Sequence, residues 1–255
     1  MADVHAAEEQ VSSIHAPCDD AEGVNSERRC GSPDSVISPG SAMAVKPWAK
    51  WICALELPAE PTRTDQIQAV LKCVLIHKRA RSDATPVQVM PGLWIGSIGA
   101  ALHPASATQF THIVCACAGI KPIWQGRGPS YLVCPILDAE SQDLTHWFSR
   151  TCAFILQALE AGGQVMVHCF AGRSRSAALI AAALIQRDRC SVPAAIRRIQ
   201  SVRAVACPNL GFLEQLAAFA GSLGIPEPAD MEAQLVACVE SATQARLALR
   251  AEMPE

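Results

Sequence analysis

The sequence predicts an α/β fold with a central mixed sheet flanked by helices on both faces. Short β-branched runs separated by turn residues lie between 87 and 136, and segments of helical periodicity precede and follow them. A buried apolar run at 164–168 (QVMVH) follows Gly162-Gly163 and leads into another helix. Strands embedded among helices in this order typically form layers around one core. With 255 residues, half of them apolar, the chain can bury such a core.

The N-terminal part is predicted to contain a tail and a single helix. Residues 1–43 are rich in Asp, Glu, Ser, Gly and Pro, so we expect a disordered acidic tail. Residues 44–85 are expected to be a linker with an amphipathic helix from about 63 to 80. Apolar residues such as Ile67, Val70 and Val74 recur there at helical spacing, and Thr62 can form a capping box with Asp65.

The remaining elements follow in order along residues 86–222, the expected main domain. Strands are expected at 87–90, 93–96, 112–117, 131–136 and 164–168, because these runs are apolar or β-branched and bounded by turn residues. Helices are expected at 144–161, 175–188, 192–203 and 209–223. A last helix at 228–250 would form most of a C-terminal helical extension, 223–255.

Composition excludes several classes of function. The formal net charge is -3, which provides no overall basic field for nucleic acid or an anionic membrane. The twelve cysteines include no Cys-x-x-Cys pair and no zinc-ligand spacing, so we expect free thiols, no metal and no cofactor. The longest apolar run within the domain, Ala177 to Ile185, is too short to span a membrane. A soluble protein of the cytoplasm, or of the nucleus, is expected.

The segment 167–176 (VHCFAGRSRS) is the candidate site. Cys169 ends a predicted strand and Arg175 opens the next helix, so the backbone N–H groups of the loop should favour a phosphate dianion and a thiolate. Arg175 offers a planar fork for two phosphoryl oxygens, and Gly172 permits a tight loop. A bare Cys-x5-Arg spacing arises about once by chance in such a chain, whereas a match that includes His168 and Gly172 is rare. The simpler alternative is a buried inert cysteine with a surface arginine.

These residues resemble the active-site signature of the dual-specificity protein phosphatases, His-Cys-x-x-Gly-x-x-Arg-Ser. Downstream, SVRAVACPNLGFLEQL (201–216) is similar to the family segment Arg-x-x-x-x-Pro-Asn-x-Gly-Phe-x-x-Gln-Leu, and GLWIGSIGAAL (92–102) is similar to its opening strand. The resemblance spans about 86–222. It implies a tyrosine-phosphatase-like fold and a signalling hydrolase that dephosphorylates phosphotyrosine, phosphoserine and phosphothreonine in proteins through a phosphocysteine intermediate.

The resemblance also implies roles for individual residues. Cys169 would be the nucleophile, with His168 orienting its thiolate and Ser176 easing its departure in the second step. Asp138, 31 positions before Cys169, matches the general acid of the family, and Asp143 is the nearby alternative. Asn209 is similar to the residue that supports the loop. Phosphate binding is assigned to the loop residues Phe170, Ala171, Gly172, Arg173, Ser174 and Arg175.

Other interpretations of the same motif stay open. Low-molecular-weight tyrosine phosphatases and rhodanese-like phosphatases also use Cys-x5-Arg, but their arrangements differ. A phosphoinositide or phosphatidylglycerophosphate-like phosphatase is a closer alternative, because Arg173 adds positive charge and lipid-directed members have a similar Ala-Gly-Arg-Ser-Arg-Ser run. Phe170, where such enzymes often have a lysine, argues against it. A pseudophosphatase would usually lack the Cys, the Arg or the acid, and all three are present here.

Partners and regulation are less well defined by the sequence. A phosphorylated MAP kinase is the natural substrate by family analogy. The basic, apolar segment 63–82 could dock into a calmodulin-like partner, although packing of its apolar stripe on the catalytic domain is the simpler interpretation. Cys117 is the candidate redox partner of Cys169, with Cys134 as the alternative. Burial of Cys117 as a small apolar core residue is the simpler interpretation.

Overall fold

The structure is a computed structural model that describes residues 49–251, so the expected tail 1–43 lies outside the described residues. Its five strands form one sheet in the order β1-β2-β5-β3-β4. β1 is antiparallel to β2, and all other neighbours are parallel, which makes the sheet mixed as predicted. The strands are β1 Val87–Met90, β2 Leu93–Gly96, β3 His112–Cys115, β4 Ser130–Val133 and β5 Val165–His168.

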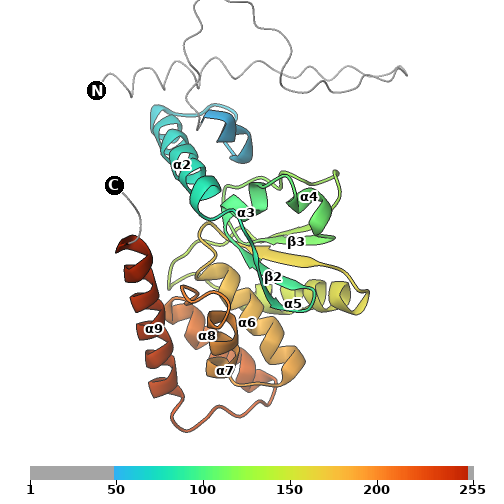
Figure 1. The fold of residues 1–255 in the computed structure, drawn as a ribbon, viewed down its shortest axis with the longest axis vertical. Coiled ribbons are helices and arrows are strands. Elements are labelled where there is room, and N and C mark those ends of the chain that lie inside the picture. Colours follow the sequence, from blue (N-terminus) through green and yellow to red (C-terminus); the bar gives the residue numbers. More distant parts are fainter. Residues whose placement is uncertain (1–48, 252–255) are drawn as a thin grey trace, which may run out of the picture.

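Helices cover both faces of the sheet (Figure 1). On one face, α5 (Thr145–Glu160) and α6 (Arg175–Asp188) pack against the central strands, and α7 (Val192–Gln200) and α8 (Leu210–Ser222) pack on α6. On the other face lie α3 (Ile98–Leu102) and α4 (Ser106–Gln109). α6 is buried from Ser176 to Ile185, so the longest apolar run in the domain forms the centre of the core.

Two further helices pack on this domain: in Figure 1, α2 lies above the sheet and α9 lies at the lower left, beside α7 and α8. α2 (Arg63–Ser82) follows a short 3-10 helix, η1 (Ala49–Ala54), and packs against α3. Its predicted capping box is confirmed: the Thr62 hydroxyl accepts from the Asp65 N–H at 3.2 Å, and the Asp65 carboxylate accepts from the Thr62 N–H at 2.9 Å. At the C-terminal end, α9 (Met231–Ala251) packs against α7.

Several predicted boundaries were too long and three short elements were missed. β3 and β4 each end earlier than the predicted 112–117 and 131–136, because the chain leaves the sheet there to enter the loops of the site. η1, α3 and α4 have at most six residues, too few for helical periodicity to show.

The face of α2 that packs on the domain is not the predicted apolar stripe. Ala69, Cys73 and Ile76 are buried, whereas Leu71 and Leu75 of the stripe are 58% and 51% exposed. The helix does pack on the domain, but the prediction that it does so through this stripe is wrong. Within residues 49–251, no helix has the length and apolarity needed to cross a membrane.

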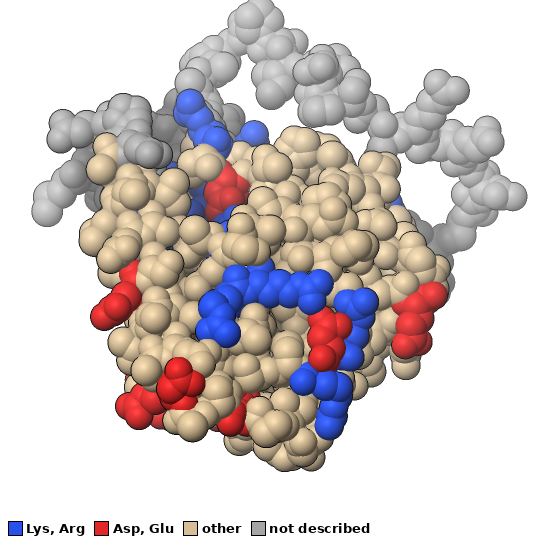
Figure 2. Space-filling view, turned by 60° about the horizontal axis from the view of Figure 1, so that its bottom comes forward, with Lys and Arg blue, Asp and Glu red and all other residues tan. Residues whose placement is uncertain are grey.

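Basic and acidic side chains lie next to one another on the face shown in Figure 2. Among the ion pairs of the described residues, Asp188 pairs with Arg198 at 2.6 Å and with Arg187 at 3.6 Å. Neighbouring charges of opposite sign of this kind agree with the small formal net charge of -3.

Candidate active site

The candidate site lies where the parallel strand β5 ends and helix α6 begins. His168 is the last residue of β5, Arg175 is the first of α6, and residues 169–174 form the loop between them. Ligand sites in sheets of this kind typically lie at the carboxyl ends of the parallel strands. The strand-to-helix junction expected from the sequence is therefore present, and it brings the predicted loop residues together.

Glycine is needed in the middle of this loop. Gly172 has φ +63°, a conformation that side-chain-bearing residues rarely adopt. A Cβ atom there would lie 2.7 Å from the Gly96 carbonyl oxygen and 2.8 Å from a guanidinium nitrogen of Arg203. The loop can thus curl tightly against β2 only with glycine at this position.

Cys169 sits at the base of the loop as a buried thiol, 1% exposed. Burial opposes its ionisation, but the positive charge of Arg175 and a 3.3 Å hydrogen bond from the Ser176 hydroxyl lower the pKa of Cys169. Backbone N–H groups of Ser176 and Arg173 act in the same direction. Neighbouring groups therefore stabilise a nucleophilic thiolate.

Arg175 reaches from the start of α6 under the loop. Its Nη1 donates to the Ile136 carbonyl oxygen at 3.2 Å, and its Nε lies 3.5 Å from the Asp138 carboxylate. Nε is buried and makes no hydrogen bond within the described residues. A donor of this kind beside a thiolate is suited to a phosphoryl oxygen.

Asp138 is held directly over the loop. Its carboxylate accepts from the Ser174 hydroxyl at 2.6 Å and from the Asn209 side-chain amide at 3.2 Å, and its side chain stays 40% exposed. Asp143 instead accepts from the backbone and the hydroxyl of Thr145 and so caps the start of α5. Of the two predicted candidates, only Asp138 contacts the phosphate-loop residues.

The segment that follows Pro208 supports the loop that carries Asp138. Asn209 caps α8 by accepting from the Phe212 N–H at 3.0 Å, which leaves its amide free to reach Asp138. Further along α8, Gln215 accepts from the Leu144 N–H at 2.7 Å and donates to the Gln142 carbonyl at 2.9 Å. The Pro-Asn-x-Gly-Phe-x-x-Gln segment thus positions the general-acid candidate.

Arg203 and Asp83 are site residues that the sequence reasoning missed. Arg203 is buried and donates to the carbonyl oxygens of Gly172 (2.7 Å) and Ala171 (2.9 Å). Its other partner is the Asp83 carboxylate at 2.8 Å, just after α2. Arg203 opens the downstream motif and could have been singled out there, but no sequence signal connects it to Asp83.

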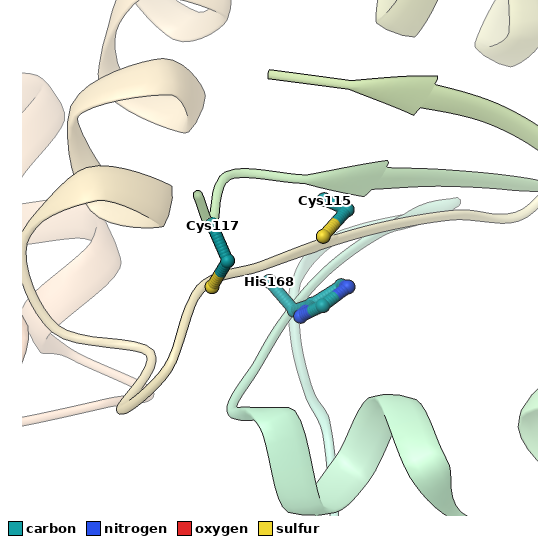
Figure 3. Close-up of side chains that lie close together, drawn as sticks. All are labelled: Cys115, Cys117 and His168. Carbon is teal, nitrogen blue, oxygen red and sulfur yellow. The ribbon is translucent and has the colours of Figure 1, made fainter. Parts of the chain in front are cut away.

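Three potential metal ligands lie behind the loop. Cys115 ends β3, Cys117 follows it, and His168 comes from the neighbouring β5, with the three side chains pointing toward one another (Figure 3). Their donor atoms all lie within 4.8 Å, and all three residues are buried. No spacing in the chain indicates this group, because its members come from two strands. It offers three ligands, one fewer than a structural zinc ion takes.

His168 also belongs to the surroundings of the nucleophile. It is buried at the end of β5, and its Nδ1 lies 3.4 Å from the Cys169 carbonyl oxygen. Burial opposes protonation of the ring, but the neighbouring Cys115 and Cys169 sulfurs raise the pKa of His168. A partly cationic imidazole at this position would favour the Cys169 thiolate.

Comparison with known proteins places the chain in a family. The dual specificity phosphatase catalytic domain matches residues 93–221. "Dual specificity protein phosphatase 1" of Arabidopsis thaliana is 30% identical over 193 residues, which cover 75% of this chain and 91% of that protein. The crystal structure of human DUSP28 superposes with a TM-score of 0.51 at 33% identity, covering 55% of this chain and 95% of that structure.

A third relative is "MAP kinase phosphatase with leucine-rich repeats protein 3" of Dictyostelium discoideum. It is 29% identical over 170 residues, which cover 66% of this chain and 19% of that longer protein. The chain belongs to the dual specificity phosphatase family. It is a protein phosphatase that acts on tyrosine and serine or threonine phosphates by a cysteine-based mechanism.

Proposed function

We propose that Cys169, Arg175 and Asp138 carry out this hydrolysis, and that the substrate is a phosphorylated kinase of the MAP kinase type. The observation that carries the assignment is the arrangement around the loop. A thiol with a lowered pKa lies beside Arg175, and the carboxylate of Asp138 lies 3.5 Å from the same guanidinium. The nucleophile, the phosphate-binding group and the acid thus lie next to one another, close enough to act on the same phosphate.

In the first step, the Cys169 sulfur attacks phosphorus. The S–P bond forms, the bond from phosphorus to the substrate oxygen breaks, and Asp138 gives its proton to that oxygen. In the second step, Asp138 takes a proton from a water that attacks phosphorus, and the P–S bond breaks to regenerate the thiolate. The Ser176 hydroxyl, 3.3 Å from the sulfur, stabilises the departing thiolate.

Arg175 binds the phosphoryl group in both steps. Its planar guanidinium can donate two parallel hydrogen bonds to phosphoryl oxygens, and its charge stabilises the transition state in which those oxygens carry most of the negative charge. The backbone N–H groups of residues 170–175 complete the cradle.

The assignment is tested with p-nitrophenyl phosphate and a phosphotyrosine peptide. Cys169→Ser is expected to abolish phosphate release while the far-UV spectrum and Tm stay close to wild type, because serine is nearly isosteric. Residual activity within about tenfold of wild type would contradict the mechanism. Arg175→Lys should be severely impaired in substrate binding, since a point ammonium cannot replace the fork.

The kinase substrate is supported by the name of the Dictyostelium relative. Its test is dephosphorylation of a purified MAP kinase phosphorylated on threonine and tyrosine, followed residue by residue with mass spectrometry. If release from this kinase is no faster than from unrelated phosphoproteins at equal concentration, another protein class is the substrate.

A calmodulin-like partner for 63–82 is a separate proposal. Its support is the part of α2 that does not pack on the domain, where Leu71 and Leu75 are half exposed beside basic residues. Calcium-loaded calmodulin should bind the full chain in calorimetry, and Leu71→Asp should weaken that binding. Equal heats with and without calcium would rule the partner out.

A further inference from the structure

The backbone of two neighbouring strands brings Cys115, Cys117 and His168 together. Cys115 and His168 are aligned partners on the parallel strands β3 and β5, so their side chains lie on the same face of the sheet. Beyond the end of β3, the Ala116 N–H still bonds the His168 carbonyl at 2.8 Å, which holds Cys117 beside the pair. Figure 3 shows the three side chains pointing toward one another. The proposed reaction makes no use of Cys115.

The donor atoms of the three residues are close enough to share one ion. They all lie within 4.8 Å of one another. Zinc binds sulfur at about 2.3 Å and nitrogen at about 2.0–2.1 Å, so the donors around a tetrahedral ion are about 3.5–3.8 Å apart. The approach that is still needed is on the order of 1 Å, and side-chain torsions can supply it while the strands stay in place.

The donor types determine which ion fits. Two sulfurs and one ring nitrogen do not suit calcium or magnesium, because both ions take oxygen ligands. Thiolates and imidazole together favour zinc and copper. Zinc takes this combination of ligands, and it also binds at sites where the protein provides three ligands and water provides the fourth.

We propose that Cys115, Cys117 and His168 bind one Zn²⁺ ion behind the catalytic loop. The inference does not rest on the proposed function, because it uses only the positions and chemistry of these three side chains. They are 1%, 2% and 2% exposed, so little water competes with them for the ion. Among His, Cys, Asp and Glu in residues 49–251, no other group of three or more donors lies this close together.

The surroundings of His168 suit a metal ligand. Its Nδ1 lies 3.4 Å from the Cys169 carbonyl oxygen, and histidines that bind metals usually donate their second ring N–H to such a group. With the proton on Nδ1, Nε2 is the nitrogen that binds the ion. A cavity of about 10 Å³ adjoins His168 and is lined also by Tyr131 and Lys121. It has about the volume that one water molecule needs, so a fourth ligand can lie beside the imidazole.

The ion would have a direct consequence for the neighbouring nucleophile. A zinc-bound Cys117 sulfur cannot at the same time form an S–S bond with Cys169. Zinc binding and formation of this disulfide therefore exclude each other, and the site would link the availability of zinc to the chemistry behind the loop.

The test measures zinc binding to the full-length, reduced chain. Cys169→Ser is the background, because it removes the nucleophile as a competing ligand. In competition with a colorimetric zinc indicator, this protein should bind one ion per chain with a Kd of about 1 µM or below. Adding Cys115→Ser or Cys117→Ser should weaken this binding about 100-fold or more, since changes around the ligands alone cost about 10–100-fold. Cys134→Ser, at a buried cysteine outside the group, is the matched control and should keep the affinity.

A second measurement identifies the ligands. Co²⁺ bound to the Cys169→Ser protein should give the visible absorption of a tetrahedral ion and a thiolate-to-cobalt charge-transfer band. Both should disappear when Zn²⁺ is added, and both should be absent when Cys115→Ser is introduced. If Cys115→Ser lowers Tm so far that the chain is unfolded, X-ray absorption of zinc-loaded Cys169→Ser decides, and it should show two sulfur ligands and at least one nitrogen.

Three results would overturn the inference. The first is the absence of zinc binding in this affinity range by the folded Cys169→Ser protein. The second is equal affinity in folded Cys115→Ser, Cys117→Ser and Cys134→Ser, which would assign the ion to other residues. The third is an X-ray absorption spectrum without two sulfur ligands. None of these results depends on turnover, so a failure of the proposed function would leave the zinc site untouched.

Discussion

Asp138 is the residue whose contribution should depend most on the leaving group. Asp138→Asn removes the proton donor but keeps a group able to accept from Ser174, so the loop should keep its shape. Hydrolysis of phosphotyrosine and alkyl phosphates, which need protonation, should slow about 100-fold or more, whereas aryl phosphates with acidic phenols should slow far less. A series of aryl phosphates of graded phenol pKa measures this directly.

Asp143→Asn is the matched control for that series. Asp143 caps α5 through Thr145, and its pKa is lowered by those hydrogen bonds, so at neutral pH it is an anion without a proton to give. Its loss should reduce stability slightly and leave the dependence on the leaving group unchanged. A leaving-group effect confined to Asp143→Asn would transfer the acid role to Asp143.

Ser176 should control the pH at which the nucleophile becomes active. Its hydroxyl donates to the Cys169 sulfur and lowers the pKa of the thiol, so Ser176→Ala should raise that pKa. The thiolate is the reactive form, and the acidic limb of kcat/KM should therefore move to higher pH. Rates of alkylation by iodoacetamide as a function of pH report the same ionisation without turnover. An unchanged alkylation profile would show that Ser176 does not act on the thiolate.

Cys117 is expected to protect Cys169 from irreversible oxidation. Peroxide oxidises the thiolate to sulfenic acid as its O–O bond breaks; the Cys117 sulfur then forms an S–S bond to Cys169 and water leaves. The backbone places the two close together, because the Ala116 N–H bonds to the His168 carbonyl at 2.8 Å. The Cys117 thiol lies close enough to Cys169 and Arg175 for their charges to affect it. The Cys134 thiol is affected instead by the charges of Cys115 and Arg150.

The prediction is tested by recovery after mild peroxide. Wild type should regain activity with dithiothreitol, and a linked peptide pair containing Cys117 and Cys169 should appear before reduction. Cys117→Ser should recover much less, while Cys134→Ser, the control, should match wild type. Equal recovery in all three proteins would leave Cys117 as core filling.

At the residue scale, the sequence predicted the site where its members are close in the chain or belong to one motif. The loop 168–176 is contiguous and stands out by itself, whereas Asp138 and Asn209 were identified because they match the family pattern upstream and downstream of it. Arg203 and Asp83 lie 120 positions apart, as the separation of their hydrogen-bonded partners shows. Only the packing of α2 against the domain brings these two together.

At the scale of elements, the catalytic loop is tied to α2 and to the segment after α7 by Arg203. Arg203→Lys keeps the charge but cannot bond the Gly172 and Ala171 carbonyls and Asp83 at once. Leaving such buried groups unsatisfied costs about 2 kcal/mol. Urea unfolding should report this loss, and kcat/KM should fall about 100-fold because the phosphate cradle shifts.

Arg198→Lys on α7 serves as the control for this substitution. Its guanidinium pairs with Asp188 at the surface, with 43% of the side chain exposed, and such pairs contribute about 0–1 kcal/mol. Stability and activity of this variant should stay near wild type. If Arg203→Lys behaves the same way, the loop does not depend on the contacts of Arg203.

The helices of the domain were easier to predict than the ends of its strands. α6 was predicted with its observed bounds, because the polar residues Gln186 and Arg187 end its apolar run. β3 ends two residues earlier than expected, although Ala116 and Cys117 are as apolar as the strand. Pairing with the neighbouring strand decides where a strand ends, and a single sequence does not contain that information.

At the scale of the whole molecule, the strand order and a cleft beside the catalytic loop could not be read from the chain. The order β1-β2-β5-β3-β4 depends on which parallel strands pair, and helices separate β2 from β3 and β4 from β5 in the chain. The cleft, of about 550 Å³ and with a basic lining, needs α2 and α9, which lie at opposite ends of the described chain, to end beside the same loop. Composition indicated only that an anion site must be local, because the net charge of -3 averages over the whole chain.

The position of α9 depends on a narrow contact with α7, which yields the last prediction. Of the residues of α9, Cys238 and Ala242 are buried, and Gln200 of α7 donates to the Cys238 carbonyl at 2.9 Å. Ala242→Asp would place a carboxylate in this apolar contact at a cost of about 2 kcal/mol or more, so α9 should detach while the sheet stays folded. Trypsin should then cut at Arg246 and Arg250 about 30-fold faster, with other sites unaffected.

Ser241→Asp, which adds the same charge one residue earlier on the exposed side of α9, is the control and should be cut at the wild-type rate. If Ala242→Asp instead unfolds the whole chain in one transition, α9 is part of the cooperative core, and the cleft is as rigid as the catalytic loop it adjoins.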